Sequence, residues 1–306
     1  MEKYYFISDA HLGSRAMKDP EEHQRKLVDL LRGMEEDAKG VFLLGDIFDF
    51  WFEYLWECYP KPVEGCADAE KRLPTEAIPY SKRPFAPVLQ QLRRMTDKGI
   101  KVHFFIGNHD IWTFGGLARM TGVTVHRRGE EITLNGKRCY LAHGDGLVPS
   151  GYIDALPKVV KRRIKRFIFL RSVFHHPAAQ ALFRMVPPAW GDAFGYEWAK
   201  RSRLKELANP FPYKGENREE LVLWAKEQEG LCAASTEHRA PRTESRAPST
   251  ENREPRTDYY IFGHRHIELD LQLASQSRVV ILGDFFRQFT YASLDADGEL
   301  MLSVFE

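Results

Sequence analysis

The chain has 306 residues, of which 43% are hydrophobic and 28% charged, which is enough to bury the core of one large or two ordinary domains. Lys and Arg number 44 against 43 Asp and Glu, so the charge indicates neither nucleic-acid binding nor an acidic tail. No signal peptide is recognisable at the N-terminus, and no stretch approaches the ~20 apolar residues that span a bilayer. The secreted, fibrous and integral-membrane classes are disfavoured, and we expect a cytoplasmic protein. Its four cysteines show no C-x-x-C spacing and are expected to be reduced: Cys58, Cys66, Cys139 and Cys232.

Strand-like and helix-like segments alternate in the first half of the chain. β-Branched and aromatic residues predict six strands, at Lys3–Ser8, Val41–Leu44, Lys101–Ile106, Lys137–Ala142, Tyr259–Phe262 and Arg278–Leu282. Apolar residues at helical spacing predict helices over Pro20–Met34 and Pro87–Lys98, the second closed by Gly99. Near the C-terminus, strands at Phe289–Leu294 and Leu300–Phe305 flank a tight turn and predict a hairpin. The alternation favours an α/β sandwich.

Two stretches interrupt this alternation. Residues 155–207 are helical in pattern and contain no metal-binding motif, so we interpret them as a lid inserted into the main fold. Residues 235–257 contain a near-repeat with no aromatic residue and no Val, Ile, Leu or Met; such a segment cannot bury enough surface to order itself, and we expect disorder there, with a binding tail as the alternative. The predicted organisation is therefore a core over 1–154, the lid over 155–207, a helical connector over 208–234, the repeat insert over 235–257, and the rest of the core over 258–306.

Five short polar motifs follow predicted strands. They are Asp9-Ala-His11, Gly45-Asp46, Gly107-Asn-His-Asp110, His143-Gly-Asp145 and Gly263-His-Arg-His266. Each places carboxylate, amide or imidazole groups where a strand ends and a loop begins, which is the usual ligand crevice of an α/β sheet. Glycine beside each donor allows a sharp turn and close approach of a ligand.

The inventory of donors indicates which metals the motifs would bind. Carboxylate, amide and imidazole without thiolate suit Mn, Fe or Zn rather than a structural zinc site. Seven donors are too many for one tetrahedral ion, but they suit two divalent ions about 3.5–4 Å apart that share a bridging carboxylate. The seven are Asp9, His11, Asp46, Asn108, His143, His264 and His266. Asp145 is expected to orient His143 or to cap a turn.

In this order, the five motifs resemble the signature of the calcineurin-like metallophosphoesterases over nearly the whole chain except the repeat insert. The resemblance implies an α/β fold in a four-layer αββα sandwich with an inserted helical lid. It also implies that a first ion is held by Asp9, His11, Asp46 and His266. A second ion would be held by Asp46, Asn108, His143 and His264, with Asp46 bridging. His109 would stabilise charge on the leaving group or act as a general acid, oriented by Asp110.

A narrower resemblance rests on three segments. Residues 9–14 (DAHLGS), 45–52 (GDIFDFWF) and 176–184 (HPAAQALFR) are similar to the UDP-2,3-diacylglucosamine diphosphatases. The resemblance implies hydrolysis of UDP-2,3-diacylglucosamine at the α-phosphate, giving 2,3-diacylglucosamine 1-phosphate and UMP in lipid A synthesis, with manganese the expected metal. His109 is a departure, because many members of that subfamily have arginine there and histidine is the commoner form in the wider superfamily. The alternatives are a metallophosphoesterase with another phosphoester substrate and, further off, a non-catalytic scaffold.

The predicted lid begins with a basic segment. Lys158 to Phe167 contains six basic residues and no acidic one, and Val160 and Ile164 share one side of the expected helix. This pattern fits a helix on an anionic membrane surface at the inner face of the cytoplasmic membrane; the alternatives are a solvated basic face and a contact with pyrophosphate. Later in the lid, candidate phosphate or sugar contacts are Ser202, Arg203 and Lys205.

Several conspicuous residues outside the motifs are interpreted as structural. The aromatic residues between Phe48 and Trp56 can line an acyl or uracil pocket, but such density is more typical of a core. Asp284 repeats the Gly-Asp pattern, but its place in the sequence favours a structural role. The same holds for the remaining histidines, which are His23, His103, His126, His175, His176 and His238.

Overall fold

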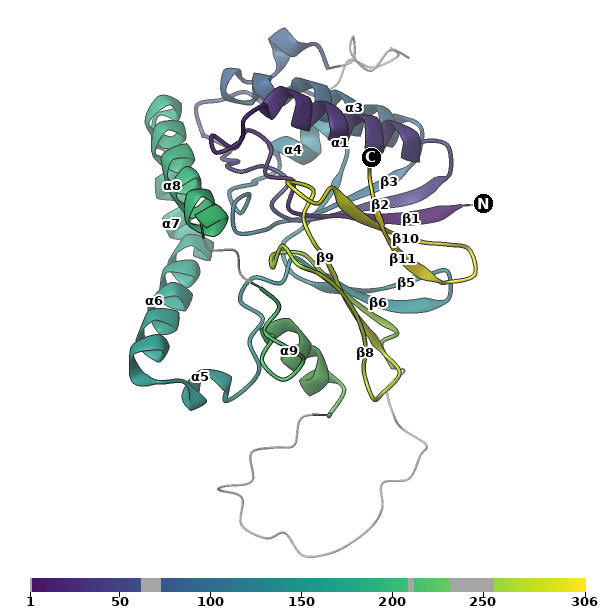
Figure 1. The fold of residues 1–306 in the computed structure, drawn as a ribbon. Helices are drawn as coiled ribbons and strands as arrows, with labels where there is room; N and C mark the ends of the chain where they lie inside the picture. The colour runs from purple at the N-terminus through teal and green to yellow at the C-terminus, as the bar shows by residue number, and fades with distance from the viewer. Residues whose placement is uncertain (1, 62–72, 209–211, 232–255) are drawn as a thin grey trace, which may run out of the picture.

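Two β-sheets form the framework of the chain in a computed structural model that describes residues 2–61, 73–208, 212–231 and 256–306 (Figure 1). The six-stranded sheet has the order β11-β10-β1-β2-β3-β4 and the five-stranded sheet the order β5-β6-β7-β9-β8. The first contains β1 (Lys3–Ile7), β2 (Ala38–Leu44), β3 (Lys101–Phe105), β4 (Thr124–His126), β10 (Thr290–Leu294) and β11 (Leu300–Val304). The second contains β5 (Glu130–Leu134), β6 (Lys137–Ala142), β7 (Tyr259–Phe262), β8 (Glu268–Gln272) and β9 (Arg278–Leu282).

The two sheets pack face to face through alternate side chains of their strands. Phe6, Phe42 and Leu44 of the first sheet share one buried cluster with Ile261 and Val280 of the second. The rings of Phe6 and Phe42, on neighbouring parallel strands, stack with centroids 5.3 Å apart. Because side chains alternate along a strand, the residues between these point to the other face of each sheet. Both faces of the central strands are therefore buried, as their nearly continuous apolar sequences predict.

Helices cover the outer faces of the sheets. Helices α1 (Pro20–Met34), α3 (Ala86–Asp97) and α4 (Gly116–Thr121) pack on the six-stranded sheet, and α9 (Glu220–Gln228) packs on the five-stranded one. Helix α1 begins where predicted, because the Asp19 carboxylate accepts a hydrogen bond from the Glu22 amide and Pro20 occupies the first turn. The short 3-10 helices η1 (Thr75–Ala77) and η2 (Tyr80–Phe85) lead into α3.

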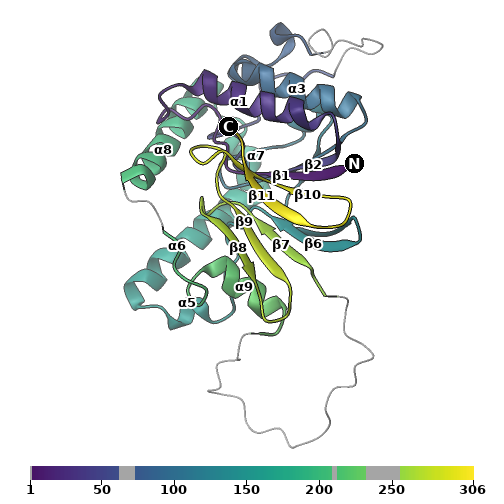
Figure 2. The ribbon, with the colours of Figure 1, turned by 45° about the vertical axis from the view of Figure 1, so that its right-hand side comes forward.

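A further group of helices lies along one side of both sheets (Figures 1 and 2). It consists of α5 (Tyr152–Ala155), α6 (Lys158–His175), α7 (Pro177–Phe183) and α8 (Pro188–Ala208). In both views α6 stands beside the five-stranded sheet and α8 beside the six-stranded one. In the described part of the chain, none of the helices has the length and apolarity needed to cross a bilayer.

The expectation of a mixed α/β protein with two sheets is confirmed, as is the C-terminal hairpin of β10 and β11. Cys58 and Cys139 are free thiols, whereas Cys66 and Cys232 lie outside the described residues. The repeat insert also lies outside them, apart from its last two residues. Of these, Thr257 is buried and donates a hydrogen bond to the Glu131 carboxylate.

Candidate metal centre

The five polar motifs meet at the carboxyl ends of β1, β2, β3, β6 and β7. Within the first sheet, the amide of Asp9 donates to the Gly45 carbonyl (3.1 Å) and the amide of His11 to the Asp46 carbonyl (2.9 Å). The second sheet is joined to the first through the Asp9 carboxylate, which accepts from the His264 amide (2.7 Å). Since parallel strands end at the same edge of their sheet, motifs far apart in sequence become neighbours.

Five of the polar residues have an unusual backbone conformation. Their φ angles are positive, at 51° for Asp9, 46° for His11, 53° for Asp46, 68° for His264 and 48° for His266. Side-chain-bearing residues rarely adopt such angles, and each costs about 1–3 kcal/mol, so they persist only where the surroundings impose them. Concentration of this strain at one place is typical of a functional site.

One cluster of donor atoms is formed by Asp9, His11 and His266, whose ligand atoms lie within 4.8 Å of one another. The Nε2 atoms of the two histidines are 3.2 Å apart, and His266 Nε2 is 3.0 Å from Asp9 Oδ1. Two imidazole nitrogens that face each other beside a carboxylate suit a shared divalent cation.

A second cluster is formed by Asp46, His143 and His264. His143 Nε2 lies 3.4 Å from Asp46 Oδ2 and 3.2 Å from Asn108 Oδ1. Asp46 also groups with His11 and His109, so its carboxylate stands between the two clusters. Asn108 was predicted to bind the same ion as Asp46, His143 and His264. Its amide oxygen lies beside His143 and so adjoins this second cluster.

Backbone carbonyls orient two of the imidazole rings, and a carboxylate lies near a third. The Nδ1 atom of His143 lies 2.8 Å from the Leu44 carbonyl, and that of His109 lies 2.7 Å from the Asp49 carbonyl. The Nδ1 atom of His11 is 3.4 Å from the Asp49 carboxylate. When Nδ1 donates to such a partner, the Nε2 lone pair is left to face the centre, as in metal-binding histidines. The residues present therefore fit divalent ions in chemistry and in orientation.

Two glycines permit this close packing. A Cβ atom on Gly107 would collide with the Asp46 carboxylate, and one on Gly263 would come within 2.5 Å of Asp9 Oδ2. The glycines of these motifs are thus required by the side chains that face them.

Asp110 supports the loops by contacts other than those expected. Its carboxylate accepts hydrogen bonds from the amides of Gly107 (2.5 Å) and Ile47 (3.0 Å). It therefore ties the backbone that follows Asp46 to the loop that precedes Asn108, while the carbonyl of Asp49 orients the His109 ring. Burial, with the Asp46 charge adding to it, raises the pKa of Asp110 to about 8.

Charge at the centre is balanced between carboxylates and imidazoles. Burial by itself would raise the pKa of Asp9, but His266 and His11 hold this pKa well below its usual range. The pKa of Asp46 is likewise held low by His143 and His109 against the effect of burial. Burial, with His143 beside it, lowers the pKa of His264 to about 4. Asp9 and Asp46 are thus anionic and His264 neutral at pH 7, which are the protonation states that ligands need. Against the effect of burial, Asp46 and Asp9 raise the pKa of His143 well above its usual range, so a cation at the centre would displace a proton from this ring.

A further buried contact to the centre comes from α8. Arg203 is 4% exposed, and its guanidinium lies 3.3 Å from His266 Nδ1, 3.3 Å from His109 Nε2 and 3.4 Å from Asp49 Oδ1. Of the other candidate contacts on this helix, Ser202 is exposed, and the side chain of Lys205 lies outside the described residues. Sequence reasoning missed Asp49, although a second carboxylate three residues after Asp46 was a usable signal.

This fold and this set of donors define the class of protein. The model of the calcineurin-like phosphoesterase family matches residues 3–268, and the chain belongs to that family, whose members are metal-dependent phosphoric ester hydrolases.

Among relatives, the chain is 33% identical to "UDP-2,3-diacylglucosamine hydrolase" of Porphyromonas gingivalis (strain ATCC BAA-308 / W83), over 96% of this chain and 94% of that one. It is 27% identical to a protein of the same name from Neisseria meningitidis serogroup C / serotype 2a (strain ATCC 700532 / DSM 15464 / FAM18), over 69% of this chain and 71% of that one. The similarity anticipated from residues 9–14, 45–52 and 176–184 is thus confirmed.

Proposed function

We propose that this chain hydrolyses the diphosphate of UDP-2,3-diacylglucosamine at the α-phosphate, releasing 2,3-diacylglucosamine 1-phosphate and UMP for lipid A synthesis. The observation that carries the proposal is the similarity to a hydrolase of that name over 96% of the chain, including the helices between β6 and β7. The complete set of donors at the strand ends supports it, because none of the seven positions has lost its ligand type.

Two divalent ions, with manganese favoured, would be held at the centre. The first would be bound by Asp9, His11, Asp46 and His266, and the second by Asp46, Asn108, His143 and His264. When bound, such ions lower the pKa of a water molecule and offset charge on phosphoryl oxygens. The placement of the Asp46 carboxylate between the two donor clusters supports its role as the bridge.

His109 and Arg203 would act on the substrate directly. His109 Nδ1 is held by the Asp49 carbonyl, so its Nε2 faces the centre 4.0 Å from Asp46 Oδ2. There it can stabilise or protonate the oxygen of the leaving sugar phosphate. The Arg203 guanidinium, 3.3 Å from the same Nε2 atom, can donate to phosphate oxygens in a fixed geometry. Ser202 and Lys205 are proposed to contact the substrate from the same helix.

The proposed domain organisation follows the expectation from the sequence. We propose a four-layer αββα sandwich over residues 1–154 and 258–306, with residues 155–207 as the lid and 208–234 as its connector to the core. The passage of α8 over the centre, with Arg203 at the donors, supports a lid. A peripheral position at the cytoplasmic face of the inner membrane would give the enzyme access to a diacylated substrate.

The proposal is tested with the purified protein, manganese and the diacylated sugar nucleotide in detergent, with products identified by mass. We expect UMP and the sugar 1-phosphate, and no turnover in D46A. UDP as the nucleotide product would contradict the bond assigned. Faster hydrolysis of p-nitrophenyl phosphate than of the diacyl substrate would favour the alternative of another phosphoester substrate.

A further inference from the structure

The residue between two of the histidine donors is an arginine. Arg265 lies between His264 and His266, which belong to the two different donor clusters. Both histidines have positive φ angles, of 68° and 48°, and such angles persist only where surrounding contacts impose them. The loop of residues 263–266 therefore depends on the contacts that hold it in place.

Two supports of this loop belong to the centre itself. The amide of Gly263 donates a hydrogen bond to the His143 carbonyl (3.0 Å), and the amide of His264 donates to the Asp9 carboxylate (2.7 Å). His143 and Asp9 are themselves proposed ligands, so these two contacts join the donors to one another.

A third support comes from outside the set of donors. The Arg265 guanidinium donates from Nε to Glu219 Oε1 and from Nη2 to Glu219 Oε2, the second bond at 3.1 Å. Such a pair of parallel bonds fixes the orientation of an arginine as well as its position. The Glu219 side chain is fully buried and that of Arg265 is 14% exposed, so water competes little for the pair.

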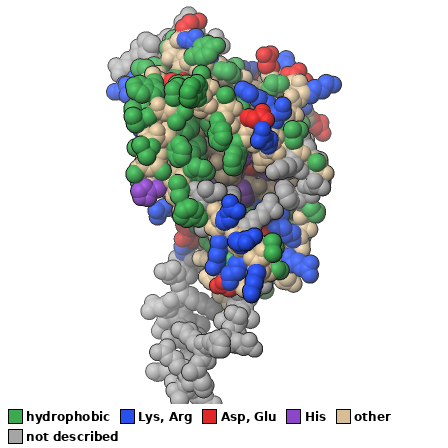
Figure 3. All heavy atoms as spheres, turned by 90° about the vertical axis from the view of Figure 1, so that its left-hand side faces the viewer, with side chains coloured by type: hydrophobic (Ala, Val, Ile, Leu, Met, Phe, Trp, Pro, Cys, Tyr) green, Lys and Arg blue, Asp and Glu red, His purple; other side chains and the backbone are tan. Residues whose placement is uncertain are grey.

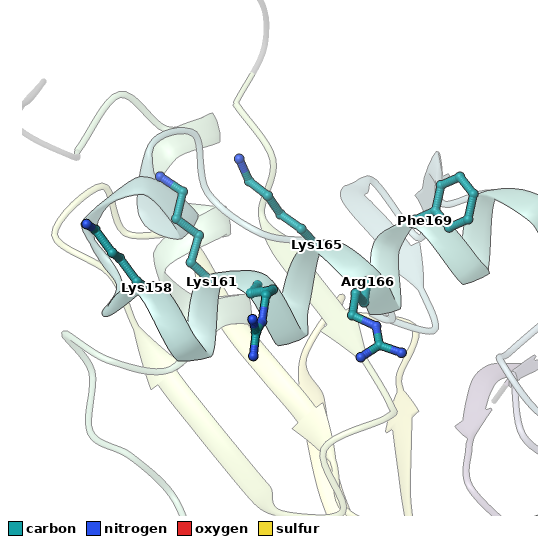
Figure 4. A pocket seen from close by; sticks show the side chains of 6 residues that line it. Lys158, Lys161, Lys165, Arg166 and Phe169 are labelled. Carbon is teal, nitrogen blue, oxygen red and sulfur yellow. The ribbon is translucent and has the colours of Figure 1, made fainter.

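In this burial Arg265 differs from the cations of α6. Lys158, Lys165 and Arg166 of that helix are exposed and line a shallow cavity of about 450 Å³ (Figure 4). Lys and Arg side chains gather at the surface on the same side of the molecule (Figure 3). Ion pairs of exposed side chains contribute little, whereas loss of one partner of a buried pair leaves an uncompensated charge. The buried pair is therefore expected to hold the loop firmly.

Glu219 is placed for this contact rather than for capping its own helix. It immediately precedes α9, at the position where a side-chain acceptor usually binds the first free amides of a helix, but its carboxylate makes no such bond. Its backbone is fixed, because its amide donates to the Gly215 carbonyl and its carbonyl accepts from the Leu223 amide (both 2.9 Å). The carboxylate is thus committed to the metal-binding loop.

Helix α9 in turn packs on the strand that precedes the loop. Leu221 and Val222 share one buried cluster with Tyr260 and Phe262 of β7, and α9 lies beside the five-stranded sheet in both ribbon views (Figures 1 and 2). Because the loop begins directly after β7, the arginine and its carboxylate partner both rest on the same packed unit.

We propose that Glu219 is a positioning residue of the metal centre, which holds the loop through Arg265 so that His264 and His266 face the two ions. In naming ions, the inference rests on the proposed function. The alternative is that the pair only stabilises the packing of α9 and has no effect on the donors. The two roles differ in how manganese binding changes when the pair is broken.

Manganese binding to the metal-free, full-length protein tests this role, with free Mn²⁺ followed by electron paramagnetic resonance. In E219Q an amide group replaces one of the two acceptors, and we expect the dissociation constants for manganese to rise at least about tenfold, as is usual for contacts that orient ligands. R265K keeps the charge but not the two-bond geometry, so it should retain more affinity than R265Q.

E220Q is the matched control. Glu220 is the adjacent carboxylate, but it accepts hydrogen bonds from Lys214 and Tyr152 instead. Because this pair is partly exposed and does not touch the loop, the dissociation constants of E220Q should stay within about twofold of those of the unchanged protein.

The double variant E219Q/R265Q separates positioning from stabilisation. It buries no uncompensated charge, so it is expected to fold even where a single variant does not. If the pair acts as one unit, the double variant should lose no more affinity than the single variants do. Urea denaturation of the metal-free proteins is the second readout. A lower unfolding free energy, with manganese constants within about twofold of those of the unchanged protein, would show a structural role only and overturn the inference.

Failure of the proposed function has a different signature. If the unchanged protein binds no manganese, the centre is not a manganese site and the positioning role falls with it. If the unchanged protein binds manganese more tightly than the Glu219 variants but leaves the diacyl sugar nucleotide intact, the substrate assignment is wrong and the positioning role stands.

Discussion

At the scale of single residues, the centre combines side chains whose place at the centre the sequence patterns predict with others whose place there only the structure reveals. The motif residues Asp9, Asp46 and His264 stand out because carboxylate or imidazole follows a strand beside glycine. Asp49 was not among the predicted donors, although a second carboxylate three residues after Asp46 was a signal. Arg203 was predicted only as a candidate phosphate or sugar contact, and its place beside the donors was not. Their roles come from the approach of α8 to the strand ends, which is a tertiary contact that no local spacing encodes.

Replacement of Arg203 should affect turnover far more than its distance in sequence from the motifs suggests. Its guanidinium lies 3.3 Å from His109 Nε2 and from His266 Nδ1, where it can bind phosphate oxygens. We expect R203A to lower kcat by about 10²-fold, the usual effect of losing one preorganised donor, and R203K to recover part of the loss because it keeps the charge. R201Q, which changes an exposed arginine two residues earlier, is the control. Steady-state kinetics on the diacyl substrate and on a small phosphodiester measure the effect. Values of kcat within twofold of the unchanged protein in all variants would contradict this role.

Glu53 should be important for stability rather than for chemistry. Its buried carboxylate accepts hydrogen bonds from the amides of Phe114 (2.6 Å), Gly116 (2.7 Å) and Leu117 (2.7 Å) at the start of α4. In E53Q the side-chain amide would turn a donor toward these donors, so we expect a loss of about 2 kcal/mol of unfolding free energy. Urea denaturation measures it, with the exposed Glu76 changed to Gln as the control. Equal midpoints for the two variants would show that the amide accepts these bonds equally well.

At the scale of secondary-structure elements, the strands whose side chains are mostly buried could be predicted from the sequence, and the exposed edge strands could not. The six strands predicted from apolar and aromatic runs in the chain interior are present to within three residues at their ends. The sequence did not reveal β4, β5 and β8, which lie at sheet edges. In β5 and in β8, three of the five side chains are exposed. Their sequences are Glu-Glu-Ile-Thr-Leu and Glu-Leu-Asp-Leu-Gln. A strand paired on one side only needs few apolar residues, so its pattern resembles that of a loop.

Helix α1 should make stability depend on pH through one buried histidine. His23 packs beneath the loop of the first motif, with Nε2 2.7 Å from the Ala10 carbonyl, and burial lowers its pKa from 6.5 to about 4. The unfolded chain protonates this histidine below about pH 6.5, whereas the folded chain does so only near pH 4. Stability should therefore be complete above pH 6.5 and be lost as the pH falls toward 4, by up to about 3 kcal/mol.

The variant H23Q isolates this effect, because glutamine can donate to Ala10 but does not titrate. We expect its unfolding free energy to fall less steeply than that of the unchanged protein between pH 6.5 and 4, as measured by urea denaturation at several pH values. Parallel curves for the two proteins would show that His23 is protonated in the folded state as easily as in the unfolded one.

At the scale of the whole molecule, the centre takes its donors from both of the sheets that pack face to face. Asp9, His11 and Asp46 follow strands of one sheet, and His143, His264 and His266 follow strands of the other. Membership of the family explains why these motifs occur in this order. The physical reason that their side chains meet is that both sheets present the ends of parallel strands at the same edge. Their convergence was predictable from the motifs, whereas the way α6 and α8 lie across that edge was not.

Because the donors come from both sheets, divalent ions should stabilise the fold as a whole. An ion at 100 times its dissociation constant adds about 2.7 kcal/mol to the unfolding free energy, which corresponds to a rise of several degrees in Tm. We expect calorimetry to show a lower Tm after treatment with a chelator and recovery on addition of manganese. D46A should show little recovery, because it removes the carboxylate shared by both donor clusters, while D97A, on the surface end of α3, should recover fully. A Tm that is independent of manganese in the unchanged protein, together with no metal retained on gel filtration, would mean that these carboxylates and imidazoles meet for a reason other than cation binding.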